Sequence, residues 1–225
     1  MDIGGIDYLG LGRVLKRGSG EILADHGDAL LVRDCVSGAL MLACDDAAAG
    51  IALLDRYAGQ DCRLLMTVGE SLGQAAFERY GFDEKLTCRQ FAYYGEKPQV
   101  PTDLTVRCAD EGDLGMLTAH YRIISPEELK AVVRRRSIYI GFHQGRTVGF
   151  IGEHLEGSMG LLYVFPEYRH RGFGTALETF LTAKIMERGD IPFGQVEKDN
   201  RESIRLQKRV GMTVSDRLML WMWKA

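Results

Sequence analysis

One segment, residues 161–177, constrains the fold more than any other part of the chain. Five apolar residues at 161–165 run into a short loop that carries Arg169, His170 and Arg171, and Gly172 and Gly174 then open a helical pattern. A strand that passes into a helix through a short glycine-containing loop is typical of α/β proteins. The segment therefore predicts a sheet flanked by helices, with a basic turn at the end of one strand.

This turn is chemically suited to an anion. Glycines let the backbone approach a ligand closely, and the first amides of a helix lack intrahelical partners and lie at its positive end. The three basic residues add charge at the same place, which favours a phosphate or pyrophosphate. The alternative is a plain strand–loop–helix with solvated side chains. A Walker loop is absent, and Leu177 stands where a dinucleotide fingerprint needs its third glycine.

Composition excludes several classes of protein. The 225 residues are 46% apolar and 26% charged, as in ordinary globular proteins, and the net charge of −3 argues against nucleic-acid binding by bulk electrostatics. No run approaches the ~20 apolar residues of a membrane span, and the first residues do not resemble a signal peptide. Five cysteines without a CxxC motif, and histidines without HxH or HExxH, predict reduced thiols, a cytoplasmic protein and no metal site.

The chain divides at a proline-containing stretch. Pro98 and Pro101 predict a linker at 98–102 between domains at 1–97 and 103–225. The two parts share a faint repeat, because residues 76–82 and 206–212 both end a helix with glycine and an apolar residue, 130 positions apart. Chance resemblance is the alternative to duplication.

Periodicity and turn signals predict the order of elements. In the first part we expect helices at 6–17, 47–57 and 71–80 and strands at 29–33, 39–43, 64–67 and 88–94. In the second part we expect strands at 104–108, 137–143, 146–154, 158–165, 193–197 and 217–223 and helices at 110–121, 126–135, 172–188 and 201–210.

The basic turn resembles a family signature. Residues 169–174, RHRGFG, look like the R/Q-x-x-G-x-G/A motif of the GNAT superfamily of acyl-CoA N-acyltransferases. Downstream, Asn200, Ser203, Leu206 and Gly211 resemble the family's last helix motif, so that the resemblance covers residues 103–225. The stretches 163–177 and 192–212 look closest to the glycine N-acyltransferase-like branch.

The resemblance implies a GNAT-like mixed sheet flanked by helices, in which a C-terminal catalytic domain is preceded by a degenerate GNAT-like half. In that first half, Asp45 and Asp46 stand where the second half has its basic residues. Carboxylates repel a pyrophosphate, so the first half is predicted to bind no coenzyme A and to serve a structural or acceptor-shaping role.

The resemblance also implies acetyl transfer from acetyl-CoA to a primary amine of a small molecule or amino acid. No cysteine lies in the motif region, which favours direct transfer in a ternary complex. The Val164 N–H would polarise the thioester carbonyl beside a strand-like pantetheine. The implied coenzyme A contacts are Tyr163, Val164, Arg169, His170, Arg171, Gly172, Phe173, Gly174, Thr175, Asn200 and Ser203.

The sequence defines the general acid and the general base of this transfer less clearly. Candidate general bases lie just before the fourth family strand, in the order Glu156, His154 and Glu153, and each is alternatively an ordinary solvated turn residue. Gln207 stands where the family often has a tyrosine acid, and an amide does not donate a proton at neutral pH. The alternative function is therefore a non-catalytic acyl-CoA-binding regulatory module. The sequence does not indicate the oligomeric state.

Overall fold

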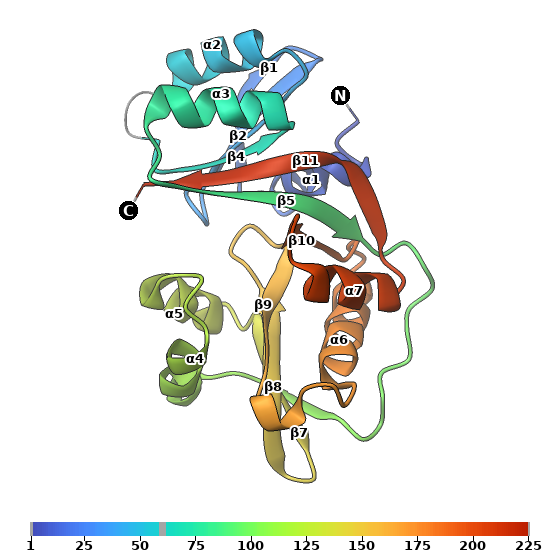
Figure 1. The fold of residues 1–225 in the computed structure, drawn as a ribbon. Helices are drawn as coiled ribbons and strands as arrows, with labels where there is room; N and C mark the ends of the chain where they lie inside the picture. Colours follow the sequence, from blue (N-terminus) through green and yellow to red (C-terminus); the bar gives the residue numbers. More distant parts are fainter. Residues whose placement is uncertain (1, 59–61, 225) are drawn as a thin grey trace. The chain divides into compact units, whose positions relative to one another are not determined.

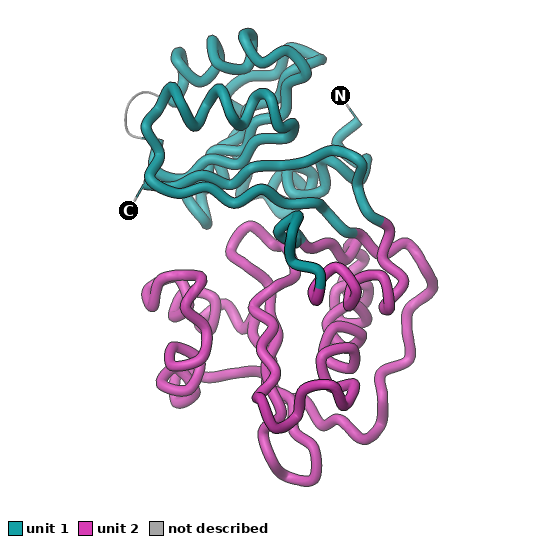
Figure 2. Tube along the Cα trace, viewed as in Figure 1, with its two compact units in different colours: residues 1–91, 195–201, 214–225 teal, residues 92–194, 202–213 magenta. Residues whose placement is uncertain are grey.

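The computed structural model describes residues 2–58 and 62–224. The chain forms two compact units (Figure 2). Unit 1 contains residues 1–91, 195–201 and 214–225, and unit 2 contains residues 92–194 and 202–213. Each unit is an α/β structure built on its own set of strands.

Unit 1 has a mixed sheet with strand order β1-β2-β3-β4-β11-β5. Neighbours are antiparallel from β1 to β3, β3 and β4 are parallel, and β11 is antiparallel to β4. The strands are β1 (Gly20–Asp25), β2 (Ala29–Asp34), β3 (Leu40–Cys44), β4 (Leu64–Val68), β5 (Glu84–Ala92) and β11 (Thr213–Trp223); the helices are η1 (Ile6–Tyr8), α1 (Leu9–Lys16), α2 (Ala47–Tyr57) and α3 (Glu70–Tyr80).

Both faces of the unit 1 sheet are covered. Leu42 and Leu65 belong to the cluster that packs under α2 and α3, whereas Met41 and Met66 belong to the cluster under α1 (Figure 1). Successive residues of a strand point to opposite faces. The near-continuous apolar runs of β3 and β4 are therefore those of strands buried on both sides.

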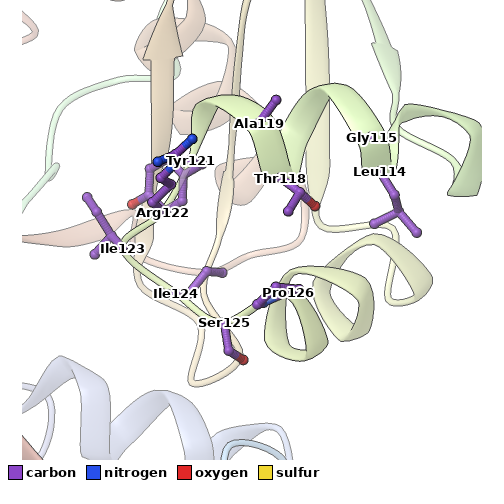
Figure 3. Close-up of a pocket in the computed structure, with 10 residues that line it drawn as sticks. All are labelled: Leu114, Gly115, Thr118, Ala119, Tyr121, Arg122, Ile123, Ile124, Ser125 and Pro126. Carbon is purple, nitrogen blue, oxygen red and sulfur yellow. The ribbon is translucent and has the colours of Figure 1, made fainter. Parts of the chain in front are cut away.

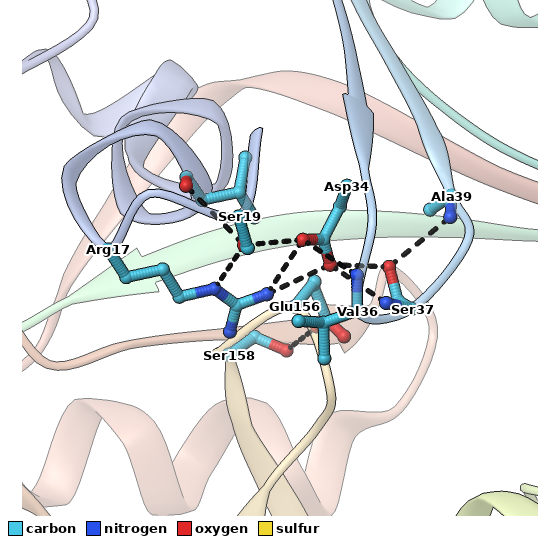
Figure 4. Close-up of polar contacts among 9 residues, drawn as sticks. Arg17, Ser19, Asp34, Val36, Ser37, Ala39, Glu156 and Ser158 are labelled. Carbon is cyan, nitrogen blue, oxygen red and sulfur yellow. Dashed lines mark hydrogen bonds and ion pairs between the residues drawn. The ribbon is translucent and has the colours of Figure 1, made fainter. Parts of the chain in front are cut away.

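A buried carboxylate holds the turn between β2 and β3 (Figure 4). Asp34 accepts hydrogen bonds from Arg17 Nη2 at 2.8 and 2.9 Å, from the Ser19 hydroxyl at 2.6 Å and from the Ser37 hydroxyl at 2.7 Å. Burial alone would raise the pKa of Asp34, but the hydrogen bonds from Ser19, Ser37 and Arg17 outweigh it and lower that pKa. This carboxyl group is satisfied on all sides and has a structural role.

Unit 2 has strand order β10-β9-β8-β7-β6, antiparallel from β6 to β9 and joined in parallel at β10. The strands are β6 (Thr105–Cys108), β7 (Ile138–His143), β8 (Arg146–Glu153), β9 (Met159–Val164) and β10 (Phe193–Glu197), of which Phe193 and Gly194 lie in this unit. The helices are η2 (Glu111–Asp113), α4 (Leu114–His120), α5 (Pro126–Arg134), η3 (Pro166–Tyr168), α6 (Phe173–Glu187) and α7 (Arg201–Arg209).

Helices cover both faces of this sheet as well (Figure 1). Phe150 and Leu161 pack with Leu117 of α4 and Leu129 of α5 in one apolar cluster. On the other face α6 packs on β8 and β9. β9 therefore has helices on both of its faces. The turn that follows β9 leads directly into α6.

The predicted sheet flanked by helices is confirmed, and several bounds differ, such as those of β5, which was predicted at 88–94 and spans Glu84–Ala92. β1 was not predicted, because its side chains are mostly exposed and it lacks a buried alternating face. The last strand begins at Thr213, earlier than the predicted residue 217. In the part of the chain that the structure describes, no helix combines the length and the apolar character needed to cross a membrane.

The compact units are not continuous in sequence. The segment after α7 belongs to unit 1 because β11 pairs with β4, with Met219 opposite Val68 and Trp223 opposite Leu64. Residues 195–201 also belong to unit 1, where the Lys198 amide donates to the Thr87 carbonyl at 2.9 Å. The division of the chain into two GNAT-like domains stays a prediction.

Candidate functional site

The turn from β9 to α6 leaves the start of the helix open. His170 and Gly172 both have left-handed backbone, with φ of 58° and 88°, and glycine fits this geometry without strain at the N-cap of α6. No side chain caps the helix, and its first internal hydrogen bond runs from the Ala176 amide to the Gly172 carbonyl at 3.0 Å. The amides of residues 173–175 therefore precede the helical ladder and are available to an anion.

Arginine side chains surround this open turn. Arg169 Nε donates to the Val164 carbonyl at 3.0 Å, and its guanidinium lies 5.6 Å from the centre of the Tyr163 ring. The guanidinium of Arg171 lies 5.5 Å from the rings of both Tyr168 and Phe173. Both arginines are exposed, and no described carboxylate pairs with either. Their charge at the turn is not neutralised locally.

A bulge turns the backbone of β9. Tyr163 lies opposite Phe150 and Gly160 opposite Gly152, so two residues of β9 face one residue of β8, and Leu161 has a φ of 52°. The Phe165 amide donates to the Val148 carbonyl at 3.0 Å. Because donors alternate along an antiparallel strand, the Val164 N–H points away from β8.

Titratable side chains gather near the start of β9. Glu156 is buried and accepts a hydrogen bond from the hydroxyl of Ser158. Burial raises the pKa of Glu128 on α5, with Glu156 adding to the rise and His154 opposing it. Burial also raises the pKa of Tyr121 to about 12, and the backbone of Leu161 hydrogen-bonds its hydroxyl. We call Tyr121, Glu128, His154, Glu156 and Ser158 the acid–base cluster.

The three predicted bases differ in their surroundings. Glu156 and His154 belong to the acid–base cluster, and the His154 ring lies so close to Gly160 that a Cβ there would be 2.5 Å from Nε2. Glu153 forms a bidentate ion pair with Arg188 at 2.7 and 2.8 Å, and only 5% of it is exposed. The carboxylate of Glu153 is thus held by a fixed cation.

The predicted coenzyme A contacts are partly gathered in space. The residues from Tyr163 to Thr175 form the end of β9, the turn and the first turn of α6, all within unit 2. Asn200 lies in unit 1 directly before α7, and its amide donates to the Glu197 carbonyl at 3.0 Å. Ser203 lies on α7 in unit 2.

Sequence reasoning missed two carboxyl groups. Glu128 completes a capping-box pattern with Ser125, whose hydroxyl accepts from the Glu128 amide at 3.1 Å, and that pattern hid the side chain's part in the acid–base cluster. Glu178 is 3% exposed on α6 and accepts from Gln207 Nε2 at 2.8 Å. A glutamate in the middle of the apolar pattern of a long helix was the available signal for Glu178.

A hollow of about 920 Å³ lies at the connection between α4 and α5 (Figure 3). Its lining includes Arg122, Ile123 and Ile124, and Tyr121 lines it as well as belonging to the acid–base cluster. The hollow and the cluster therefore adjoin at Tyr121. Among the described residues, no three His, Cys, Asp or Glu side chains are grouped so as to hold a metal ion.

Comparisons with known proteins bear on the fold. Residues 139–222 match the family model described as FR47-like protein. No curated protein matches the sequence. The search of solved structures found a Drosophila protein with 18% identity and a TM-score of 0.68, covering 97% of this chain and 90% of the other.

Two bacterial structures have a similar fold. The GCN5-related N-acetyltransferase from Kribbella flavida has 12% identity and a TM-score of 0.60, with 98% of this chain and 95% of the other covered. The GNAT-family acetyltransferase from Colwellia psychrerythraea has 13% identity and a TM-score of 0.54, with 100% and 98% covered. Neither comparison bears on the glycine N-acyltransferase-like branch. The FR47-like match thus lies in the second half of the chain, and the chain as a whole shares the fold of these two acetyltransferase structures.

Proposed function

We propose that this protein is an acyl-CoA-dependent N-acyltransferase that moves an acetyl group from acetyl-CoA to a primary amine of a small molecule or amino acid. The observation that carries the proposal is the β9–α6 turn. It combines an uncapped helix N-terminus, a glycine in left-handed backbone and two exposed arginines without carboxylate partners. This is the arrangement that a pyrophosphate requires.

The donor would be held by backbone and arginine. The amides of residues 173–175, together with Arg169 and Arg171, would bind the pyrophosphate of coenzyme A. The Val164 N–H, which points away from β8, would polarise the thioester carbonyl. One such donor typically lowers the barrier by about 3–4 kcal/mol.

The acid–base cluster would take the proton of the acceptor. The amine nitrogen bonds to the carbonyl carbon, the C–S bond breaks with its electron pair on sulfur, and the ammonium proton passes to the cluster. Burial keeps Glu128 a stronger base than an ordinary carboxylate. Glu153 is a poorer candidate because Arg188 neutralises it.

The amine itself would lie in the hollow beside the cluster. An α-amine has a pKa of roughly 8 and a lysine amine roughly 10.4, so a carboxylate or histidine base favours small amines and amino acids over protein lysines. The transfer would be direct, in a ternary complex. The first half would bind no coenzyme A, because Asp45 and Asp46 occupy its corresponding turn.

The test is release of free thiol from acetyl-CoA in the presence of a panel of amines, with isothermal titration of coenzyme A alongside. We expect one coenzyme A per chain and thiol release on small amines. E128Q and E156Q should lower kcat and change the pH–rate profile, whereas E127Q, an exposed neighbour on the same helix turn, should not. Tight binding without thiol release on any amine would favour the regulatory-module alternative, and acetylation of protein lysines alone would overturn the small acceptor.

A further inference from the structure

The hollow at the connection between α4 and α5 has a lining that suits one kind of amine. α4 ends at His120, and the chain runs through residues 121–125 before Pro126 opens α5, with the hydroxyl of Ser125 as its cap. The described lining comes from α4, from this connection and from the start of α5, all within unit 2 (Figure 3). One continuous segment, residues 114–126, therefore sets the chemistry of the hollow.

Most of this lining is apolar. It includes Leu114, Ala119, Ile123, Ile124 and Pro126. Ile123 is 74% exposed, the highest value among the exposed large apolar side chains of the described residues. Apolar area that is removed from water contributes favourable free energy in proportion to its size. A bound molecule with an apolar body would cover Ile123, whereas glycine would leave it in water.

One charged side chain stands among these apolar residues. Arg122 is the only charged residue in the described lining, and it is exposed. Among the described residues no carboxylate pairs with Arg122, whereas Arg134 of α5 pairs with Glu111 at 2.9 Å. A guanidinium presents parallel N–H donors that match the two oxygens of a carboxylate. Arg122 is thus available to a carboxylate on a molecule in the hollow.

The acid–base cluster adjoins the same hollow. Tyr121 lines the hollow, and the carboxyl groups of Glu128 and Glu156 act electrostatically on its hydroxyl. The hollow therefore lies beside acidic groups that attract an amine and beside a guanidinium that attracts a carboxylate. Tyr121 and Arg122 are consecutive, and an α-amino acid carries its amine and its carboxylate on one carbon. A second ammonium group on the acceptor would instead be repelled by Arg122.

We propose that the acceptor is an α-amino acid with an apolar side chain, and that Arg122 selects it by binding its carboxylate. This inference rests on the proposed function and narrows its substrate class. The amine nitrogen bonds to the acetyl carbon, the C–S electron pair goes to sulfur, and the proton goes to the acid–base cluster. The carboxylate takes no part in these bond changes, and the side chain of the amino acid covers Ile123 and Ile124.

The experiment compares the kcat/KM values for L-leucine, isoamylamine and glycine in the full chain. Isoamylamine is leucine without its carboxylate, and glycine is the amino acid without an apolar side chain. The wild-type protein should prefer leucine over each of them by about tenfold or more. Because the amines also differ in pKa, the decisive quantity is the change of each preference between wild type and a variant. Such a double-mutant cycle isolates the contact itself.

Arg122 is tested against a matched arginine. R122Q should reduce the preference for leucine over isoamylamine about tenfold, because glutamine lacks the charge and the paired donors. R135Q removes the same charge from an exposed position of unit 2 outside the lining and should keep the wild-type preference. Equal losses in R122Q and R135Q would overturn the role of Arg122.

Ile123 is tested in the same way. I123A should reduce the preference for leucine over glycine about fivefold, because it removes part of the apolar lining. Its high exposure means that the substitution removes little packing from the folded protein. I22A is the control, since Ile22 is 53% exposed in unit 1, and it should leave the preference unchanged. A wild-type protein that acetylates glycine as well as leucine would overturn the apolar side chain.

A binding measurement separates this inference from the proposed function. In an NMR titration without acetyl-CoA, with and without coenzyme A, leucine should bind about tenfold more tightly to wild type than to R122Q. Should no amine be acetylated, the proposed function fails, and leucine binding that depends on Arg122 would still assign the hollow to an apolar amino acid. Equal binding to the two proteins, or no binding to either, would reject that assignment.

Discussion

Two turns of this chain each join a strand to a helix, and they differ in what they offer an anion. Between β3 and α2, the carboxylate of Asp46 caps the helix by accepting from the Ala49 amide at 2.9 Å, and Asp45 pairs with Arg217 at 2.7 Å. Between β9 and α6, Gly172 supplies no cap, and the three residues before it are Arg169, His170 and Arg171.

The comparison distinguishes what the strand–turn–helix fold provides from what the residues of the turn provide. Both helices have a positive N-terminus, since this follows from backbone geometry. In the first turn the protein's own carboxylate occupies that end, and in the second turn the end is open. One residue at the cap, with the charge around it, therefore decides whether a strand–turn–helix unit can serve as a phosphate site.

The largest effect is expected from placing an aspartate at the N-cap of α6, because an aspartate, Asp46, is the N-cap of α2. In G172D a carboxylate would stand beside the pyrophosphate. Two unit charges 4 Å apart repel by about 4 kcal/mol at an effective dielectric constant of 20, so coenzyme A should bind nearly 1,000-fold more weakly. Isothermal titration measures this loss.

G172N is the matched control for that substitution. Asparagine tolerates the left-handed backbone of Gly172 about as well as aspartate and has nearly the same shape without the charge. A loss in G172N as great as that in G172D would show that shape, and not charge, distinguishes the two turns.

The next effect concerns the strand that enters the first turn. Asp34 holds the connection to β3, and D34N would leave Arg17 without its carboxylate, at a cost of about 3 kcal/mol in the free energy of unfolding. The pKa of Asp34 is lowered in the folded state, so its stabilisation is present above the unfolded value and disappears as the pH falls below roughly 4. Urea unfolding between pH 3 and pH 7 checks both statements.

The exposed pair of Asp55 and Arg79 supplies the control for Asp34. D55N should cost much less stability, because exposed ion pairs contribute little. If D34N and D55N were equally destabilised, the buried network would have no special part in holding β3.

A smaller effect is expected from the arginines of the second turn. The double substitution R169A/R171A should weaken coenzyme A binding by about tenfold at low salt, and the difference should shrink as added salt screens the exposed charges. The double substitution R56A/R63A removes the same charge from two exposed positions of unit 1 and should leave binding unchanged. Equal losses in both variants would assign the effect to net charge.

The smallest effect is expected from removing the side-chain cap of α2 in the turn between β3 and α2. D46A removes the side-chain cap of α2 and should lower the stability by about 1 kcal/mol. It should not create a second site, because Asp45 remains and no arginine in the turn replaces it. A titration that gave two coenzyme A molecules per D46A chain would show that the Asp46 cap alone prevents coenzyme A from binding at the turn between β3 and α2.

The sequence was sufficient for the strand, turn and helix around Gly172 because their signals are local. An apolar run, two glycines and a long apolar periodicity all lie within residues 161–187, and the structure has β9 and α6 there. The same holds for α2, whose predicted bounds match those observed. Local patterns define these elements without help from the rest of the fold.

The missed features depend on tertiary packing. Glu128 looked like a capping residue, and only the placement of α5 over β9 brings it to His154 and Glu156. Glu178 differs from an exposed helix glutamate only because α7 covers it. Local sequence patterns do not show which helix covers which face of a sheet or of another helix. Burial of the Glu128 and Glu178 carboxyl groups therefore could not be predicted.

The pairing of β11 has a consequence for how the protein is made. In unit 1 this strand lies between β4 and β5, so the middle of that sheet is filled by a strand that follows every other described element in the sequence. While residues 92–212 are being synthesised, β4 and β5 each lack a neighbour and expose backbone groups that pair readily with other chains. The sheet of unit 1 therefore stays incomplete until β11 has been synthesised. During this interval its unpaired strands favour aggregation.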